Sequence, residues 1–168
     1  MTLLRSALLG FCMVGASWAA FGQIKIGQTV GVTGAVAATV KEASMGAQFY
    51  IDAINAKGGI GGEKIELITL DDKFDTKLAV ANARELIEQR GVLALFMTRG
   101  TPHTEGIIPI LDQHGVALLG PSTGAMVLHQ PLKKHVFNVR ATYQREAERA
   151  ITHLAATGVT RIGVVHVD

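Results

Sequence analysis

Short apolar runs alternate with helix-like segments along most of this chain, and this order limits its possible folds more than any other feature. Strands are expected over residues 24–30, 64–70, 92–97, 116–119, 136–140 and 161–167. A strand, helix, strand order with right-handed crossovers produces parallel strands with helices on both faces. The sequence therefore predicts an α/β fold with a doubly wound, Rossmann-like parallel sheet.

The helical segments between these strands have recognisable ends. Thr39 and Glu42 have the spacing of a capping box at the start of the first helix, and Gly58 ends it. Asp75 is expected to cap the second helix, a short third helix covers 107–111, and a fourth covers 144–156. The side chains expected to face inward are Ala43, Ala47, Tyr50, Ile51 and Ile54 in the first, Leu78, Ala81, Leu86 and Ile87 in the second, and Ala147, Ile151, Leu154 and Ala155 in the fourth.

Residues 1–22 have the pattern of a secretory signal rather than of a folded element. Arg5 supplies the positive start, an apolar stretch follows over 6–16, and small residues allow cleavage after Ala19 or after Gly22. The alternative is a membrane anchor, but the apolar stretch is shorter than the roughly 20 residues that a spanning helix needs. We therefore expect the mature chain to be exported.

Cysteine content and charge exclude several classes of protein. The only cysteine, Cys12, lies within the expected signal, so no disulfide is expected in the mature chain. A lipoprotein signal would need a small residue before Cys12, where Phe11 stands. The chain has 16 basic and 14 acidic residues, and one of the basic ones, Arg5, is in the signal. This near balance gives no indication of nucleic acid or of an anionic membrane as a partner.

Two hydroxyl-rich turns, over 98–102 and 120–124, each follow a strand-length apolar run. In a parallel sheet these turns lie side by side at the carboxyl ends of the strands, where open α/β folds bind small ligands. Thr101, Ser122 and Thr123 are therefore candidates for binding a small polar or anionic ligand, through hydroxyl groups and backbone N–H groups at helix N-termini. Their alternative role is to cap helices and nothing more.

The second turn also has the G-x-S-x-G pattern that presents a nucleophilic serine in hydrolases. An esterase that uses Ser122 is thus an alternative function. Its context opposes that function, because Pro131 interrupts the long helix that the pattern requires. No acid and histidine follow on separate loops that would converge above the sheet. Among the histidines, His103 is retained as a possible contact at the rim of the ligand site.

No cofactor or metal ion is expected. The glycines of 27–34 lack the closely spaced first pair of a dinucleotide fingerprint, and Asp71 is more readily explained as a loop or capping residue than as a ribose ligand. The six histidines are scattered without the spacing of zinc ligands. Asp71, Asp72 and Asp75 resemble half of a calcium loop but lack its later glycine and glutamate.

Several segments together resemble the periplasmic substrate-binding proteins of branched-chain amino acid (Leu/Ile/Val) ABC transporters. They are Ile24-Lys25-Ile26-Gly27, the stretch from Asp52 to Gly62 that contains Ile54-Asn55-Ala56-Lys57-Gly58-Gly59-Ile60, Leu70-Asp71-Asp72, Gly115-Val116 with 120–124, and Phe137-Asn138-Val139-Arg140. The resemblance implies a type I periplasmic binding fold, in which a small molecule binds between two lobes and a membrane permease recognises the closed form. By position it assigns ligand binding to Thr101, Ser122, Thr123 and Gly124. It implies no enzymatic activity.

The resemblance also implies a domain division and an incomplete fold. Residues 23–142 correspond to the amino-terminal lobe without its returning strands, and 143–168 to the start of the second lobe. We therefore expect a truncated periplasmic protein that binds amino acids weakly or not at all. Gly100-Thr101-Pro102-His103 stands where amino acid binders of the family often have a serine-rich loop. A sensor or interaction lobe of the same fold, without a transporter, is the remaining alternative.

Overall fold

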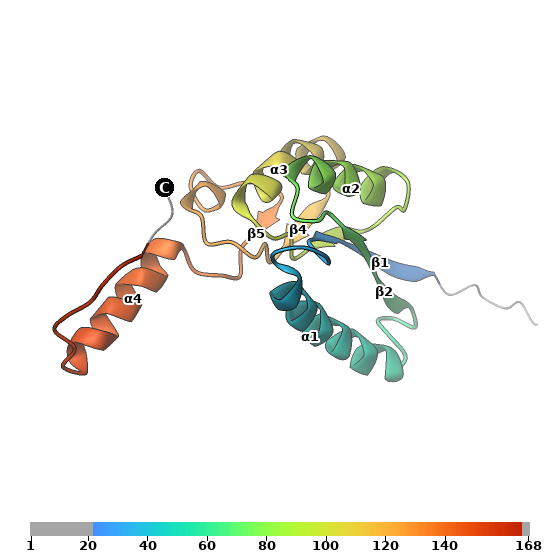
Figure 1. Ribbon diagram of the computed structural model, residues 1–168. Coiled ribbons are helices and arrows are strands. Elements are labelled where there is room, and N and C mark those ends of the chain that lie inside the picture. Colours follow the sequence, from blue (N-terminus) through green and yellow to red (C-terminus); the bar gives the residue numbers. More distant parts are fainter. Residues whose placement is uncertain (1–21, 166–168) are drawn as a thin grey trace, which may run out of the picture.

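The computed structural model describes residues 22–165 and contains one parallel sheet with helices on both faces (Figure 1). The strand order is β2-β1-β3-β4-β5, and every pairing is parallel. The strands are β1 (Gln23–Val30), β2 (Lys64–Asp71), β3 (Ala94–Phe96), β4 (Ala117–Leu119) and β5 (Val136–Phe137). The helices are α1 (Ala37–Ala56), α2 (Thr76–Glu88), α3 (Thr101–His114) and α4 (Tyr143–Ala156), with a 3-10 helix η1 (Met126–Leu128). The predicted fold class is confirmed.

Helices α2 and α3 cover one face of the sheet, and α1 lies on the other (Figure 1). This arrangement follows from right-handed crossovers, because the connection from β1 to β2 runs one way along the sheet and those from β2 to β3 and from β3 to β4 run the other way. The strand order also puts β2 at one edge, where β1 is its only partner among the described residues. None of the helices in 22–165 combines the length and the apolar character that crossing a membrane requires.

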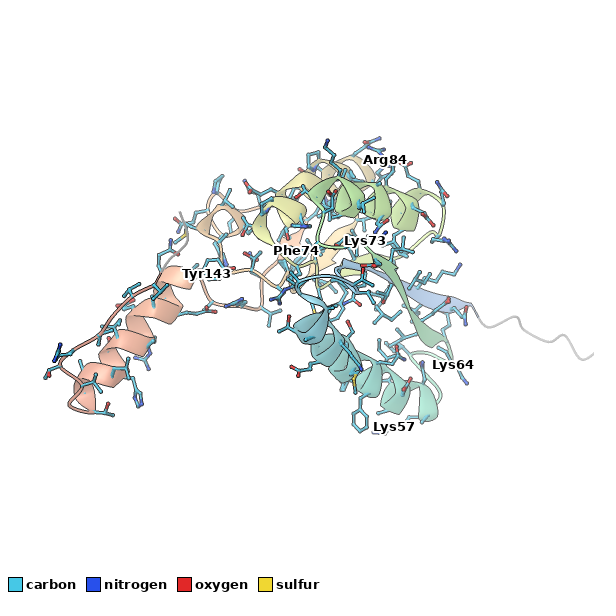
Figure 2. All side chains as sticks on the ribbon, viewed as in Figure 1. Lys57, Lys64, Lys73, Phe74, Arg84 and Tyr143 are labelled. Atoms are coloured by element: carbon cyan, nitrogen blue, oxygen red, sulfur yellow. The ribbon has the colours of Figure 1, made fainter. Side chains whose placement is uncertain are left out.

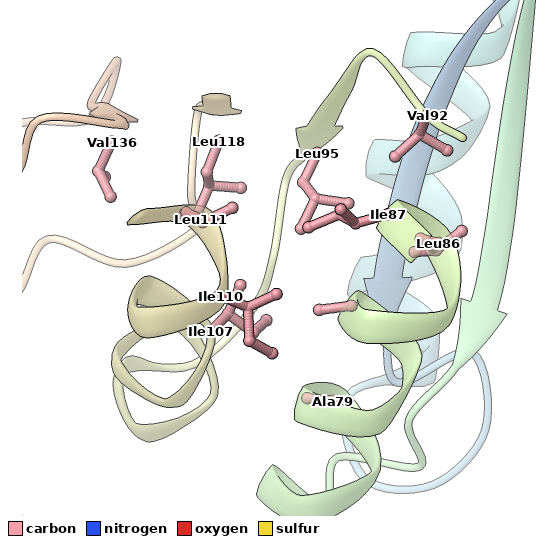
Figure 3. Close-up of a cluster of buried hydrophobic side chains, with 11 residues drawn as sticks. Ala79, Leu86, Ile87, Val92, Leu95, Ile107, Ile110, Leu111, Leu118 and Val136 are labelled. Carbon is pink, nitrogen blue, oxygen red and sulfur yellow. The ribbon is translucent and has the colours of Figure 1, made fainter. Parts of the chain in front are cut away.

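The main core fills the space between the sheet and helices α2 and α3 (Figure 3). Leu95 and Leu118 point from the strands towards Leu86 of α2 and Leu111 of α3, and all four are fully buried. The buried face of α2 starts with two alanines, so this helix lies close to its neighbours. Its buried residues are Ala79, Ala83, Leu86 and Ile87. Leu86 and Ile87 therefore face inward as predicted, whereas Leu78 and Ala81 are exposed.

Two predicted helix caps have different outcomes. Asp75 caps α2 as expected, since its Oδ1 accepts from the Leu78 N–H at 2.9 Å. The capping box of α1 was wrong. This helix starts after Val36 without a side-chain cap, and the Thr39 hydroxyl donates to the Val36 carbonyl at 3.0 Å.

Helix α1 is less deeply buried than the pattern of its side chains predicted. Only Val40 and Ile51 are buried in it, and Tyr50 is exposed, as is Ala43. Its far end is fixed by polar contacts, because the Asn55 side chain both accepts from the Ile65 N–H and donates to the Ile65 carbonyl, each at 2.8 Å. The helix is therefore held to β2 by an amide as well as by apolar packing.

The last part of the chain departs from the prediction. Helix α4 forms over nearly the expected residues and extends away from the sheet (Figure 1). None of its side chains is buried, and Ile151 and Leu154 are exposed. Residues 161–165 were expected to start a strand and are not part of the sheet. All five of these residues are exposed. The expected signal, over 1–22, and the end of the expected last strand fall almost wholly outside the described residues.

Candidate functional site

The two hydroxyl-rich turns meet at the carboxyl ends of β3 and β4. These strands pair in register from Ala94 with Ala117 to Phe96 with Leu119, so both turns leave the sheet at the same level. The Ser122 N–H donates to the Thr98 carbonyl at 2.7 Å. The hydroxyl oxygens of Thr101 and Thr123 are 2.7 Å apart. The predicted side-by-side placement of the two turns is confirmed.

The first turn leads directly into α3, which starts earlier than predicted. Gly100, with φ of 94°, is its N-cap, and Pro102 occupies the first turn. A positive φ suits glycine, and a proline there loses only an N–H that the helix would not use. The Thr104 hydroxyl donates to the Gly100 carbonyl and lies 2.9 Å from the hydroxyl of Thr98. Thr101 is thereby held at the helix N-terminus, where the helix dipole favours an anion.

The second turn buries Thr123 and leaves Ser122 partly exposed. Thr123 Oγ1 accepts from the Ala125 N–H at 3.3 Å, and η1 follows. Ser122 forms no hydrogen bond with a histidine in the part of the chain that the structure describes. A three-residue 3-10 helix also cannot act as the long helix of a nucleophile elbow. The local structure is therefore not that of a nucleophile elbow.

Gly124 packs tightly against the segment that leads into α4. A Cβ atom at this position would lie 2.6 Å from the Ala141 carbonyl oxygen and 2.9 Å from the Tyr143 nitrogen. The Tyr143 N–H donates to the Gly124 carbonyl at 2.8 Å. The second turn and the first residue of α4 are thus in direct contact, and only glycine fits between them.

Tyr143 belongs to the site, and sequence reasoning missed it. Its hydroxyl oxygen is 3.1 Å from Thr123 Oγ1, so it continues the pair formed by Thr123 and Thr101. Figure 2 shows Tyr143 where α4 begins. No motif marks this residue. Its only sequence signal is its position directly after Thr142, which caps α4 by accepting from the Arg145 N–H.

His103 is not a rim contact, because its side chain is only 5% exposed. The ring stacks on Phe74, with centroids 4.6 Å apart, and neither ring nitrogen has a hydrogen-bond partner among the described residues. Its Nδ1 lies against Gly100, where a Cβ would be 2.6 Å away. His103 therefore supports the start of α3 from behind and does not reach a ligand.

Asp71 and Asp72 at the end of β2 fix the neighbouring loops. Asp71 accepts from the Thr33 hydroxyl at 2.6 Å, and this hydrogen bond is the main cause that lowers the pKa of Asp71 below its ordinary value. Asp72 is buried and accepts from the Phe74 N–H and the Thr29 hydroxyl. Burial raises the pKa of Asp72 above its ordinary value. Both carboxylates thus have structural partners.

The paired turns present hydroxyl groups at a helix N-terminus, an arrangement that suits a carboxylate or another polar group of a small ligand. Among residues 22–165, no three His, Cys, Asp or Glu side chains lie close enough to share a metal ion. A cavity of about 470 Å³ lies elsewhere, between α1 and β2, and includes none of Thr101, Ser122, Thr123 and Gly124. These four residues, called the platform below, are therefore separate from this cavity.

The chain is similar in sequence and in structure to several known proteins. The Leu/Ile/Val-binding protein BraC3 of Rhizobium johnstonii is 35% identical over 135 residues, which are 78% of this chain and 35% of that protein. A crystal structure of a possible leucine/isoleucine/valine-binding protein from Rhodopirellula baltica has a TM-score of 0.77 at 28% identity, over 85% of this chain and 38% of that one. The substrate-binding protein LivJ of Streptococcus pneumoniae, solved in complex with isoleucine, has a TM-score of 0.67 at 30% identity, over 72% of this chain and 34% of that one.

This chain spans about a third of the length of the curated relatives that it matches, with 24% to 39% of their residues aligned. The match to a known family extends over residues 23–168. The family and these relatives are solute-binding proteins and not enzymes. The chain belongs to the periplasmic binding protein family.

Proposed function

We propose that this chain is the amino-terminal part of an extracytoplasmic solute-binding component of an ABC uptake system. Its ligands would be amino acids of the branched-chain type or related small polar molecules. The observation that supports this function best is the hydroxyl pair of Thr101 and Thr123 at the N-terminus of α3. The printed names of the relatives support the ligand class.

In this proposal, the platform binds the carboxylate and ammonium groups of the ligand. Thr101 and Ser122 offer hydroxyl groups and Gly124 offers its backbone N–H, while the buried Thr123 holds the Thr101 hydroxyl in place. Charge-assisted hydrogen bonds of this kind are typically worth about 1.5 to 3 kcal/mol each. Two or three of them offset only part of the entropy that a small ligand loses on binding. A lone platform is therefore expected to bind weakly.

The rest of the functional assignment follows from the same proposal. Residues 1–22 are a signal that directs the chain to the periplasm, 23–142 form the ligand-binding lobe, and 143–168 begin a second lobe. A membrane permease is the partner of the complete protein, and the ligand needs no cofactor.

Chemical-shift perturbation by NMR tests the ligand site. Titration with L-isoleucine should shift the backbone amides of Thr101, Ser122, Thr123 and Gly124, with weak affinity. Isoleucinamide, which lacks the carboxylate, is the matched control and should produce much smaller shifts. Shifts confined to other residues, or equal shifts with both compounds, would contradict the proposed site. Micromolar affinity would contradict the expectation that this platform alone binds weakly.

A further inference from the structure

The hydroxyl groups of Thr101, Thr123 and Tyr143 form a continuous chain of hydrogen bonds. Thr123 Oγ1 is 2.7 Å from Thr101 Oγ1 and 3.1 Å from the Tyr143 hydroxyl, and it accepts from the Ala125 N–H. A threonine hydroxyl donates one hydrogen bond and accepts two. Because Ala125 already uses one acceptor position, Thr123 must accept from one of its two hydroxyl neighbours and donate to the other.

This constraint leaves two possible directions for the chain of donors. In one direction, Tyr143 donates to Thr123 and Thr123 donates to Thr101, so the Thr101 proton is free to point outward. In the other direction, Thr101 donates to Thr123 and Thr123 to Tyr143, so the outward proton belongs to Tyr143. The three hydroxyl groups can therefore offer an outward proton at one end only.

A ligand carboxylate beside Thr101 selects between these directions. It accepts the Thr101 proton, which requires Thr123 to donate to Thr101 and Tyr143 to donate to Thr123. Hydrogen bonds in such a series polarise one another, so each strengthens the next. We infer that Tyr143 is a positioning residue of the ligand site, whose hydroxyl orients Thr123 and Thr101 towards an anionic acceptor. The direction of these hydrogen bonds thereby links an occupied site to the first residue of α4. This inference rests on the proposed function for the identity of the ligand.

Tyr143 is held in place for this role by contacts on several sides. Its N–H is bonded to the Gly124 carbonyl, and the Arg140 guanidinium lies 5.0 Å from the centre of its ring. Arg140 is itself fixed by two hydrogen bonds to Glu146, of 2.6 and 2.7 Å. The ring is thus fixed by its neighbours, while 45% of the side chain remains accessible.

The direct test needs no ligand. The full chain has two tyrosines, so tyrosine labelled with carbon-13 at Cζ gives two NMR signals, and Tyr50→Phe identifies that of Tyr143. Thr101→Val should shift the Tyr143 signal, although Thr101 is two hydrogen bonds away from it. Thr39→Val, which removes a distant hydroxyl on α1, should not. An unchanged Tyr143 signal in Thr101→Val, or an equal shift in Thr39→Val, overturns the inference.

A second measurement separates this inference from the proposed function. L-Isoleucine is titrated into the parent chain and into Tyr143→Phe, which keeps the ring beside Arg140. The variant should bind about fivefold more weakly, as expected for one hydrogen bond, at an unchanged melting temperature. Equal affinities overturn the role of Tyr143. If the parent does not bind isoleucine, the proposed function fails for this ligand, and the Cζ shifts alone decide whether the hydroxyl chain exists.

Discussion

At the scale of single residues, two adjacent aspartates at the end of β2 have opposite electrostatic surroundings. Asp71 gains hydrogen bonds in the folded state, above all from Thr33, and its pKa is lowered. Asp72 loses water by burial, and its pKa is raised. Since the unfolded chain gives both groups ordinary pKa values near 3.8, they affect the pH dependence of stability in opposite directions.

We therefore expect opposite changes from neutralising the two carboxylates. In the acid range the folded state binds fewer protons at Asp71 than the unfolded state does. The free energy of unfolding therefore rises with pH because of this group, and the contribution of Asp71 is lost as pH falls. At Asp72 the folded state retains its proton to higher pH, so this group makes stability fall as pH rises above 3.8. Asp71→Asn should remove the increase in the free energy of unfolding with pH that Asp71 causes. Asp72→Asn should remove the decrease that Asp72 causes. Urea unfolding from acid to neutral pH measures both. The same slope change in both variants would contradict the assignment.

The sequence was sufficient to predict that Thr101 and Thr123 would lie close together, because parallel strands bring their carboxyl ends to one edge. It was not sufficient for Tyr143, whose contact with Thr123 depends on the path from 138 to 142 across the surface. His103 was misplaced for a related reason. A polar residue in a turn is usually solvated, and only the stacking on Phe74 explains its burial.

At the scale of elements, α2 and α3 lie so close that a residue larger than glycine between them would have to displace a neighbouring side chain. A Cβ atom at Gly106 of α3 would lie 2.8 Å from a methyl group of Val80, which belongs to α2. Gly46 is also in the middle of a helix, but a Cβ there would meet nothing within 4 Å. The two glycines therefore separate the effect of helix propensity from that of packing.

Gly46→Ala should stabilise the chain by up to about 1 kcal/mol, because alanine is the better helix former. Gly106→Ala gains the same propensity but must displace the stiff Val80 side chain, and overpacking costs about 1 to 3 kcal/mol. We expect Gly106→Ala to be neutral or destabilising, and clearly less stable than Gly46→Ala, when their free energies of unfolding are compared. Equal stabilisation by both substitutions would show that α2 and α3 can separate freely.

Helix α4 shows what local sequence patterns predict and what they do not. The cap at Thr142 and the run of helix formers predict the helix itself. Its apolar face over Ile151 and Leu154 was expected to be buried, but burial depends on a partner that local patterns cannot supply. The short strands β3 and β5 reflect the same limit, since pairing rather than apolar composition determines where a strand ends.

We expect α4 to open far more readily than α3. Opening α4 exposes no buried side chain, whereas opening α3 exposes Ile107 and Leu111 from the core. Hydrogen exchange followed by mass spectrometry should therefore show nearly unprotected amides over 144–156 and strong protection in the last turns of α3. Equal protection of the two helices would mean that α4 packs on another surface in solution.

At the scale of the whole molecule, the platform and α4 are joined at a few atoms. The bond from Tyr143 to Gly124 and the hydroxyl contact with Thr123 link the segment beyond 142 to the sheet. The parallel, doubly wound sheet was predicted from the sequence, whereas the strand order and this junction were visible only in the structure.

The position of β2 at the edge of the sheet has a further consequence, for the behaviour of the protein in concentrated solution. No strand pairs with the outer side of β2 among the described residues, where the Asn55 side chain binds only the backbone of Ile65, and such edges recruit strands from other molecules. Lys64 and Glu66 place charges along this edge. Replacing both with threonine should cause concentration-dependent association in light scattering, whereas Glu148→Gln with Arg149→Gln on α4 should not. The two charged side chains of β2 would then be what keeps the molecule monodisperse.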